Sequence, residues 1–314
     1  MGKLLVQGYG HCLGDKVYTN EDMKQFVETS DEWILSRTGI KQRHFAESMT
    51  NVMMATEAVT MALSKSTLSK NMIDGIIVAT MTPDTAMPSM AHQLKAALNI
   101  QNDKLLAFDI NTACSGFIVA LQVADALITT GQCKHICVVG SEKMSSILDF
   151  NDRGTCVLFG DGAGAVIVSQ DDSSEFNWVH FSNSESDTQQ VLITDPTQNH
   201  KILMQGQAVF RFAIKAMSDA IEQVCEEANI TPDAIDYFIP HQANVRILDH
   251  VASKMNLDKS KFITNVDHVG NTSAASIPIA LSEAMEHQRI KPNSLVCFVG
   301  FGGGLSWGAT LGKV

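Results

Sequence analysis

An internal duplication is the feature of this sequence that most constrains its fold. Three short segments recur in the same order 160–162 positions further along the 314-residue chain. The pairs are residues 73–78 with 235–240, 111–114 with 271–274, and 137–140 with 297–300. Both copies alternate strand-like and helix-like runs, which indicates α/β layers around a mainly parallel sheet. The sequence therefore predicts two copies of one α/β unit, residues 1–170 and 171–314. The polar stretch 170–190 is expected to be the loop and linker between them.

The duplication also predicts that three polar side chains meet in one cleft. If the halves pack about a pseudo-twofold axis, the ends of matching strands converge. Cys114 follows a strand-like run, His241 follows the strand that matches residues 73–78, and Asn271 lies in the loop that matches the Cys114 loop. Each residue alone is more often an ordinary core or turn residue. Three unlike polar groups at matching strand ends favour a catalytic site.

The position of Cys114 suits a nucleophile. The residue lies between a strand-like run at 105–110 and a helix-like run at 117–127. A thiol at the start of a helix lies beside free N–H groups and the positive end of the helix dipole, and both favour the thiolate. A thiolate can attack a carbonyl carbon and carry the acyl group. We therefore expect Cys114 to be an ionised, acyl-carrying nucleophile.

Composition excludes several other classes of protein. The chain has 23 Lys and Arg against 34 Asp and Glu, a net charge of −11, which argues against nucleic-acid binding. Its seven cysteines occur singly, and Cys133 and Cys137 lack His or Cys partners at metal-ligand spacing. No apolar run reaches membrane-spanning length, and the first 20 residues lack the pattern of a signal peptide. We expect a reduced, cytoplasmic protein without metal and without membrane contact.

Seven motifs along the chain together carry a family resemblance. They are TSDEW at 29–33, RTGI at 37–40, RGT at 153–155, FGDGAG at 159–164, PHQAN at 240–244, GNTSAAS at 270–276 and FGGGLSWG at 301–308. As a set they resemble the β-ketoacyl-acyl-carrier-protein synthase III family of thiolase-fold condensing enzymes, from about Leu4 to the C-terminus. The resemblance implies a thiolase-like five-layered α-β-α-β-α fold and a homodimer. It implies no cofactor, because acyl-CoA and malonyl-acyl-carrier protein are substrates.

The resemblance also implies a reaction and the residues that perform it. In this acyltransferase family a cysteine takes the acyl group of an acyl-CoA primer, and malonyl-acyl-carrier protein then loses CO₂ and attacks it, which initiates fatty-acid synthesis. Cys114 would be the nucleophile, with acetyl-CoA as the expected primer. The N–H groups of Cys114 and Gly303 would form the oxyanion hole. His241 and Asn271 would stabilise the malonyl enolate as hydrogen-bond donors.

The pairing of one His with one Asn narrows the type of condensing enzyme. Elongating synthases resemble Cys-His-His, and thiolases use Cys-His-Cys. One His and one Asn point to the priming type or to the chalcone-synthase type. The glycines at 302–304 contain no proline, which favours the priming type.

Substrate contacts are carried over from the resemblance in the same way. The CoA contacts are expected at Thr29, Trp33, Arg37, Arg153, Gly206 and Asn244. Trp33 and Arg153 match the pair that sandwiches adenine. The docking surface for acyl-carrier protein maps onto Arg211, Arg246 and Lys254.

Met87 and Phe301 are expected at the acyl pocket. Met87 stands where relatives often have Phe, in a segment that reaches the pocket of the partner subunit. Methionine is slimmer and more flexible than phenylalanine, which predicts room for chains longer or more branched than acetyl.

Two alternatives remain open at the level of sequence. A starter-unit condensing enzyme or acyltransferase of a natural-product pathway would share the same triad. A non-catalytic CoA-binding or scaffold protein belongs to a different class. The intact set of Cys114, His241 and Asn271 speaks against the second alternative, because a protein without chemistry has no need of all three.

Overall fold

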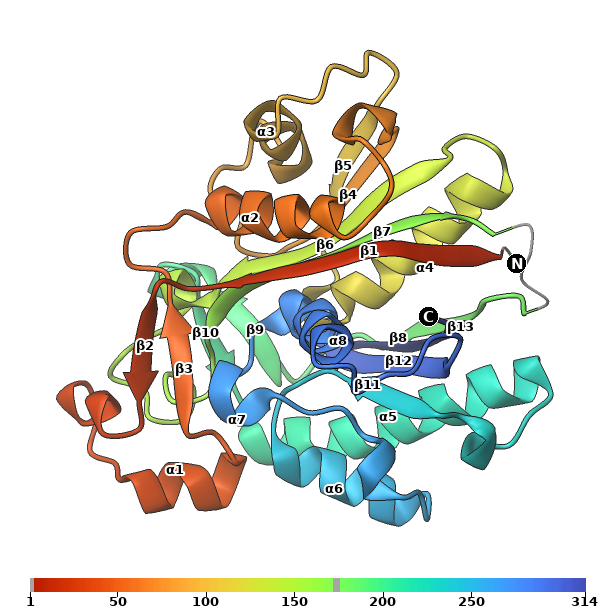
Figure 1. Cartoon of the computed structure of the whole chain (residues 1–314). Coiled ribbons are helices and arrows are strands. Elements are labelled where there is room, and N and C mark those ends of the chain that lie inside the picture. Colours follow the sequence, from red (N-terminus) through yellow and green to blue (C-terminus); the bar gives the residue numbers. More distant parts are fainter. Residues whose placement is uncertain (1–2, 172–175) are drawn as a thin grey trace.

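The computed structural model describes residues 3–171 and 176–314 and has five layers in the order α-β-α-β-α (Figure 1). Two sheets enclose a central pair of helices, and further helices cover each outer face. The helical layers are α2 (Asn51–Ser64) and α3 (Met90–Ala97) outside the first sheet, α4 (Gly116–Thr129) and α8 (Ser276–Glu286) in the centre, and α5 (Gly206–Ala228) and α6 (Val245–Lys254) outside the second sheet. The predicted five-layered fold is therefore confirmed.

The first sheet has five strands in the order β1-β7-β6-β4-β5. Their bounds are β1 Leu4–Leu13, β7 Asp161–Gln170, β6 His135–Lys143, β4 Gly75–Ala79 and β5 Leu106–Ile110. All five residues of β4 are buried, because helices cover both faces of the sheet. β4 runs parallel to β5 and β6, so the carboxyl ends of these strands lie at one edge.

The second sheet has four strands in the order β11-β12-β13-β8. Their bounds are β11 Tyr237–Pro240, β12 Leu295–Gly302, β13 Ser306–Lys313 and β8 Val179–Ser184. β11 and β12 are parallel, and β13 pairs antiparallel with both β12 and β8. The parallel pair again brings two carboxyl ends, those of β11 and β12, to one edge of its sheet.

Two expectations about these sheets are wrong. Only three of the seven strand pairings described in the two sheets are parallel, because β1, β7, β8 and β13 run antiparallel to their neighbours. The stretch 170–190, expected to be loop and linker, contains β8. Alternation of Val179 and Phe181 with polar residues lets β8 pair along one edge of the sheet. The part of that stretch at 172–175 lies outside the described residues.

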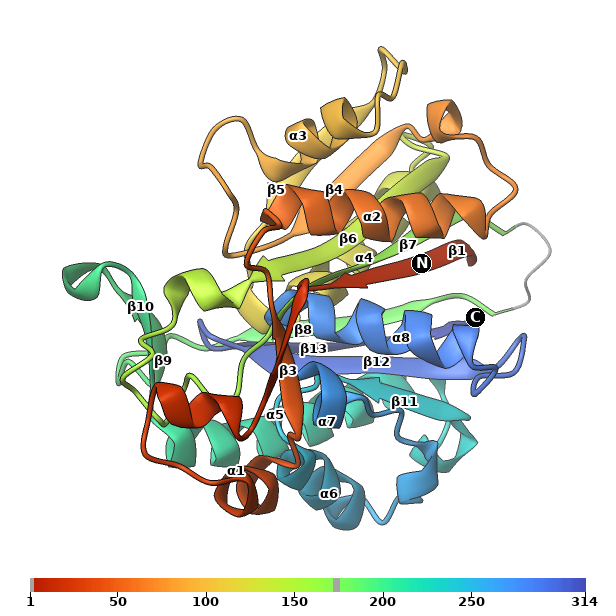
Figure 2. The same ribbon diagram turned by 60° about the vertical axis from the view of Figure 1, so that its left-hand side comes forward.

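The remaining elements flank one end of the layers (Figure 2). They are β2 (Lys16–Thr19), β3 (Gln42–Phe45), α1 (Asp31–Thr38), β9 (Leu192–Asp195), β10 (Lys201–Met204) and α7 (Val266–Val269). β9 and β10 form a two-stranded antiparallel hairpin that projects beside this end.

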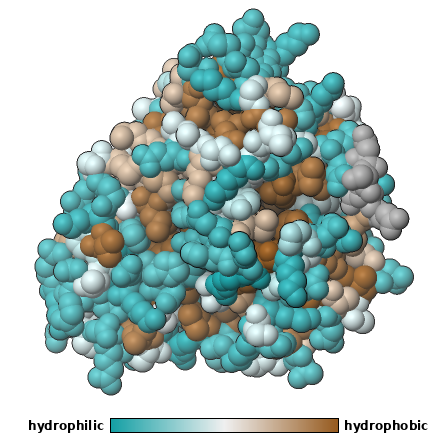
Figure 3. All heavy atoms as spheres, viewed as in Figure 1, coloured by the Kyte–Doolittle hydropathy of each residue, from teal (hydrophilic) through white to brown (hydrophobic). Residues whose placement is uncertain are grey.

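Most of the face seen in Figure 3 is hydrophilic, with small hydrophobic patches between polar side chains.

The central helices fix the loops that precede them. α4 is apolar on nearly every side, as expected for a helix buried between two sheets. Phe117 and Leu121 of α4 lie in one buried cluster with Ile277 and Leu281 of α8. Because both helices are anchored in this core, the loops at their N-termini are held against each other at the middle of the molecule.

Candidate active site

Cys114 lies in a short 3₁₀ turn, η3 (Ala113–Ser115), between β5 and α4. Its side chain is buried, and burial raises the pKa of the thiol to about 12. A hydrogen bond with Ser273 acts in the opposite direction, whereas the charge of Glu142 raises the pKa further. The resting side chain is therefore a thiol, and the predicted thiolate is wrong, because loss of hydration outweighs the start of the helix.

His241 follows β11 and is 1% exposed. Its Nδ1 lies 2.7 Å from the Oγ of Ser276, the first residue of α8. Burial lowers the pKa of the imidazole to about 3, so the ring is neutral. Phe301 packs edge-on against the ring, with 5.4 Å between the ring centroids. The site therefore holds an oriented, uncharged imidazole that is hydrogen-bonded to the Ser276 hydroxyl group, which also lies 2.9 Å from the Ser273 carbonyl.

Asn271 is held by its backbone and by its own side-chain oxygen. Its N–H donates to the Leu158 carbonyl and its carbonyl accepts from Gly160 N–H, each at 2.9 Å. Its Oδ1 accepts from the Ser273 N–H at 2.9 Å. This bond fixes the orientation of the amide, so the Nδ2 donors are left for a ligand.

The Cys114 and Asn271 loops are structural copies of each other. In the first half Asn111 Oδ1 accepts from Ala113 N–H at 3.2 Å, which repeats the bond from Ser273 N–H to Asn271. Ala113 has φ 47° and Ser273 has φ 50°, so both loops contain a non-glycine residue in the left-handed region at the same point. The second loop leads into η8 (Ser273–Ala275), the counterpart of η3. The duplication in the sequence is therefore repeated in the backbone.

All three predicted catalytic residues line one cavity of about 800 Å³. Five other residues expected at the site line it as well: Arg37, Gly206, Asn244, Phe301 and Gly303. Gly302 is packed so tightly on the nucleophile that a Cβ on it would lie 2.7 Å from Cys114 N. The glycine run therefore lets the backbone reach the loop of the nucleophile. The structure brings the Cys, the His and the Asn together as the duplication predicted.

The residues expected to hold adenine lie outside this cavity. The guanidinium carbons of Arg153 and Arg37 lie 4.6 and 4.9 Å from the centroid of the Trp33 ring. Arg153 also donates to the Glu28 carbonyl at 3.0 Å. Arg153 therefore stacks directly on Trp33, and an adenine ring would have to displace it to be sandwiched. Thr29, the other predicted contact outside the cavity, has a buried hydroxyl oxygen without a partner among the described residues.

Asn244 links the predicted CoA site to α6. It caps this helix, because its Oδ1 accepts from the Arg246 N–H at 2.8 Å. Its Nδ2 donates to the Arg37 carbonyl at 3.1 Å, which ties α6 to α1.

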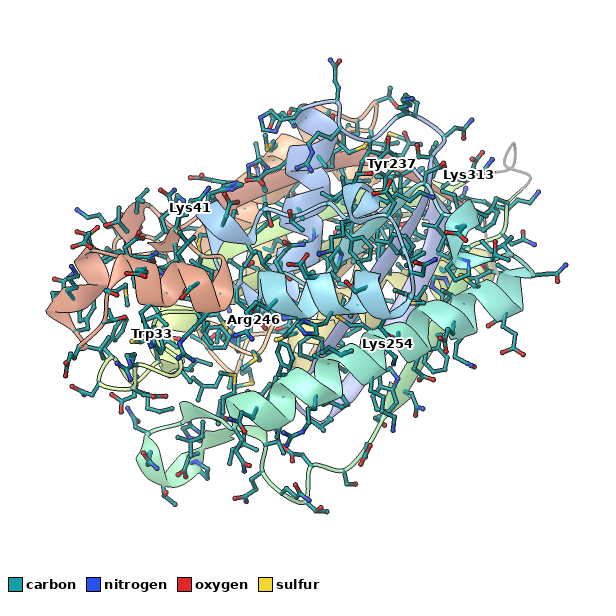
Figure 4. All side chains as sticks on the ribbon, turned by 90° about the horizontal axis from the view of Figure 1, so that it is seen from below. Trp33, Lys41, Tyr237, Arg246, Lys254 and Lys313 are labelled. Atoms are coloured by element: carbon teal, nitrogen blue, oxygen red, sulfur yellow. The ribbon has the colours of Figure 1, made fainter. Side chains whose placement is uncertain are left out.

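The three residues expected to dock the carrier protein are exposed on the outer helices of the second sheet. Arg211 lies on α5, and Arg246 and Lys254 lie at the two ends of α6. In Figure 4 Arg246 lies between Trp33 and Lys254 on one face of the molecule. Arg246 also lies over the ring of Phe210, at 5.8 Å from its centroid.

The two residues expected at the acyl pocket differ in their surroundings. Phe301 is buried, lines the cavity and touches His241. Met87 is 87% exposed in the loop before α3. Within one chain Met87 is not among the residues that line the cavity. Its expected contact is with the pocket of a partner subunit, so that expectation stays a prediction.

Several residues of the site were missed by the sequence analysis. Ser273 and Ser276 lie within the motif at 270–276, but no contact was predicted for them. Glu142 was missed, although the duplication pairs it with Gly302, 160 positions later. The hairpin β9–β10 also lines the cavity, through Leu192, Ile193, Thr194, Ile202 and Met204. The repeat marks the positions of Ser273, Ser276 and Glu142 through their counterparts at 113, 116 and 302, but it does not show their contacts. The hairpin has no counterpart in the repeat.

Among the described residues, no helix is both long and apolar enough to span a membrane. In the same part of the chain, no group of three or more His, Cys, Asp or Glu side chains is placed to hold a metal ion.

Comparison with known proteins gives matches in both halves. Residues 108–187 match the family model of 3-oxoacyl-[acyl-carrier-protein (ACP)] synthase III, and residues 225–314 match the model of its C-terminal part. The chain is 44% identical over 303 residues to β-ketoacyl-[acyl-carrier-protein] synthase III of Acholeplasma laidlawii, covering 96% of each chain. It is 43% identical over 311 residues to the synthase III of Aquifex aeolicus, covering 99% of each.

Solved structures agree with these matches. The crystal structure of 3-oxoacyl-[acyl-carrier-protein] synthase III from Aquifex aeolicus superposes with a TM-score of 0.94 at 43% identity, covering 99% of this chain and 100% of the other. The priming β-ketosynthase of the R1128 polyketide biosynthetic pathway superposes with a TM-score of 0.91 at 28% identity, covering 99% and 97%. The similarity therefore extends over both sheets and the loops that carry Cys114, His241 and Asn271.

Proposed function

Because the chain belongs to the β-ketoacyl-[acyl-carrier-protein] synthase III family, an acyltransferase family of fatty-acid synthesis, we propose that it joins an acyl-CoA primer to malonyl-acyl-carrier protein through an acyl group on Cys114. The observation that carries the proposal is the single cavity lined by Cys114, His241 and Asn271. We expect acetyl-CoA as the primer.

The first half-reaction loads the enzyme. Cys114 Sγ attacks the thioester carbonyl of acyl-CoA, and the CoA thiolate leaves. The tetrahedral intermediate carries an oxyanion, which needs N–H donors placed before the reaction. The N–H groups of Cys114 and Gly303 are proposed for this task. Gly302 supports it, because its lack of a side chain lets β12 approach Cys114 N.

The second half-reaction makes the carbon–carbon bond. Malonyl-acyl-carrier protein loses CO₂, and negative charge moves to its thioester oxygen as the enolate forms. His241 Nε2–H and Asn271 Nδ2–H are proposed as the two donors to this oxygen. A proton on Nε2 requires Nδ1 to accept a hydrogen bond. The Ser276 hydroxyl can donate it at 2.7 Å when it turns from the Ser273 carbonyl, which lies 2.9 Å away. The enolate carbon then attacks the acyl carbonyl, and the Cys114 thiolate leaves.

The contacts with CoA are proposed at the residues that the sequence analysis predicted. Thr29, Trp33, Arg37, Arg153, Gly206 and Asn244 would hold CoA. The stack of Arg37 and Arg153 on Trp33 supports a role of these residues in binding an adenine ring and phosphates, since it gathers two guanidinium groups around one half-buried aromatic ring.

We also propose Arg211, Arg246 and Lys254 as the basic surface for the acidic carrier protein. Their exposure on adjacent helices supports this proposal, because docking against a chain of net charge −11 needs a local basic face.

A cytoplasmic homodimer is part of the same proposal. β5 is an edge strand of the first sheet, and Leu106 on it is 41% exposed. Met87 lies in the loop before α3, the helix that packs on β5, and is 87% exposed. An open sheet edge with exposed apolar side chains is a typical site for pairing with a second copy. Such a dimer would give Met87 the partner pocket that a single chain lacks.

The experiment that tests the function reads Cys114 directly. Intact-mass analysis after incubation with acetyl-CoA should show one acetyl adduct on the wild-type chain and none on Cys114→Ala. Addition of malonyl-acyl-carrier protein should then remove the adduct and yield a 3-ketoacyl product with release of CO₂. A chain that acquires the adduct but leaves malonyl-acyl-carrier protein intact would be an acyltransferase of the alternative type. A chain that acquires no adduct from a panel of acyl-CoA lengths would refute the proposal.

A further inference from the structure

A carboxylate that the mechanism does not use lies behind the nucleophile. Glu142, near the end of β6, is 0% exposed. Its oxygens accept from Thr80 Oγ1 at 3.2 Å, Met81 N–H at 3.2 Å and Thr82 N–H at 3.1 Å. They also accept a short hydrogen bond from the Thr82 hydroxyl and one from Ser273 Oγ at 3.2 Å. Five donors thus converge on one buried acid.

Two opposed effects act on the charge of Glu142. Burial favours the neutral acid and raises its pKa to about 7, whereas the surrounding donors favour the anion. The two backbone N–H groups can only donate, so they bind the anion without competition. When the carboxyl group takes up a proton, one of the three hydroxyl groups must rotate to accept its O–H, because the N–H groups cannot accept.

Ser273 connects this acid to the nucleophile. Its hydroxyl group donates to Glu142 Oε1 at 3.2 Å. The turn η8, which begins with Ser273, packs against the turn η3 that carries Cys114, and hydrogen bonding by Ser273 lowers the pKa of the Cys114 thiol. Ser273 is 0% exposed and is held in place by the bond from its N–H to Asn271. A hydroxyl group between an acid and a thiol can accept one proton as it donates another.

On the basis of the proposed function, we propose that Ser273 and Glu142 form a proton relay that takes the proton from Cys114 during acylation and returns it after condensation. Glu142 acts through Ser273 and is a positioning residue. His241 is then free to remain a hydrogen-bond donor in both half-reactions.

The proton balance closes over the cycle. As Cys114 Sγ attacks acyl-CoA, its proton moves to Ser273 Oγ and the hydroxyl proton of Ser273 moves to Glu142. The CoA thiolate leaves and takes a proton from water. Glu142 keeps its proton while Cys114 is acylated. When the condensation expels the Cys114 thiolate, Glu142 returns the proton through Ser273.

The surroundings of Glu142 contain few competing charges. The groups that contact it from the segment after β4, Thr80, Met81 and Thr82, are neutral, as is Ser273 from η8. Lys143, the next residue on β6, donates instead to the Met49 carbonyl at 2.9 Å. The charge of Glu142 raises the pKa of the Cys114 thiol.

The test is the pH dependence of Cys114 reactivity between pH 5.5 and 9.5. Single-turnover acetylation by acetyl-CoA, followed by intact mass, should rise in the wild type through an inflection near pH 7, because Glu142 must be ionised to accept the proton. Glu142→Gln should lose this inflection and acetylate about 10²-fold more slowly at pH 7.5, the low end for general acid–base groups. Glu142→Asp should restore the inflection.

Two further variants separate the relay from damage to the fold. Asp161→Asn removes another buried carboxylate with three donors, at Ala46 N, Ser145 N and Ser145 Oγ, and should keep the inflection. Ser273→Ala breaks the relay while keeping both the acid and the backbone, since Ala113 has the same left-handed conformation in the matching loop. It should lose the inflection even if Glu142→Gln does not fold.

The rate at which iodoacetamide alkylates Cys114 can be measured over the same pH range without any CoA. If this rate shows the inflection but acetyl-CoA leaves no adduct, the relay is supported and the proposed function is rejected. If the wild type is acetylated and Ser273→Ala shows the same pH profile, the relay is wrong. Loss of the inflection in Asp161→Asn would also overturn the relay.

Discussion

Gly302 is the residue at which one added methyl group should disturb the nucleophile most directly. A Cβ on Gly302 would lie 2.7 Å from Cys114 N and 3.2 Å from Ser115 N. Ordinary contact begins near 3.4 Å, so the Cys114 loop or the end of β12 must move by the difference of 0.7 Å. Both obstacles are backbone atoms, which cannot rotate away as a side chain can.

The size of the effect follows from this shift. Displacement of a reacting group by about 1 Å costs about 10²-fold in rate, so Gly302→Ala should slow acetylation of Cys114 by nearly that factor, about 2.5 kcal/mol. Overpacking should also lower the free energy of unfolding by about 1–3 kcal/mol. The assay is single-turnover acetylation by acetyl-CoA, read by intact mass and corrected for the folded fraction.

Gly75→Ala is the matched control. Its Cβ would lie 2.8 Å from Ile136 Cγ1, at the start of β4 and away from the carboxyl ends that form the site. We expect a loss of stability, no larger than that of Gly302→Ala because the obstacle is a side chain, with a wild-type rate of acetylation. If Gly302→Ala acetylates as fast as the control, Gly302 does not position Cys114 N–H, and the proposed oxyanion hole is wrong.

Three other outcomes are expected. Trp33→Ala should raise the KM for acetyl-CoA about fivefold, the equivalent of about 1 kcal/mol of stacking, with kcat unchanged. An unchanged KM in steady-state assays would contradict adenine binding there. Arg246→Glu should raise the KM for malonyl-acyl-carrier protein while sparing acyl transfer from CoA, and equal losses in both half-reactions would rule out a docking role. Hydrogen bonding to Glu283 raises the pKa of His268 from 6.5 to about 9. The folded state therefore binds the proton more tightly, and this stabilisation is complete below pH 6.5 and is lost as the pH rises through 9. The melting temperature of His268→Gln should accordingly fall below that of the wild type at pH 6 and converge with it above about pH 9.5; a constant difference across this range would count against the His268–Glu283 pair.

The fold and the triad were predictable because the duplication acts at long range. Two matching units must place matching strand ends at equivalent edges, so the offset between Asn111 and Asn271 predicted that their loops meet. The backbone agrees in detail, down to the left-handed residues Ala113 and Ser273. Strand direction was less predictable, since buried parallel and antiparallel strands share the same apolar runs. β8 was missed because an edge strand needs few apolar residues and its partner β13 lies more than 100 positions away.

The sequence by itself determined the five-layered fold, the family and which Cys, His and Asn line one cavity. All of these follow from motifs and from the internal repeat, which can be seen in the sequence alone. Only the tertiary structure decided the ionisation of the site, because pKa values depend on what surrounds a group rather than on its neighbours in sequence. The start of α4 predicted a thiolate at Cys114, but burial keeps it a thiol, and the same burial makes His241 neutral. Glu142 became visible as a partner of the nucleophile only when folding brought Ser273 from the other half between them.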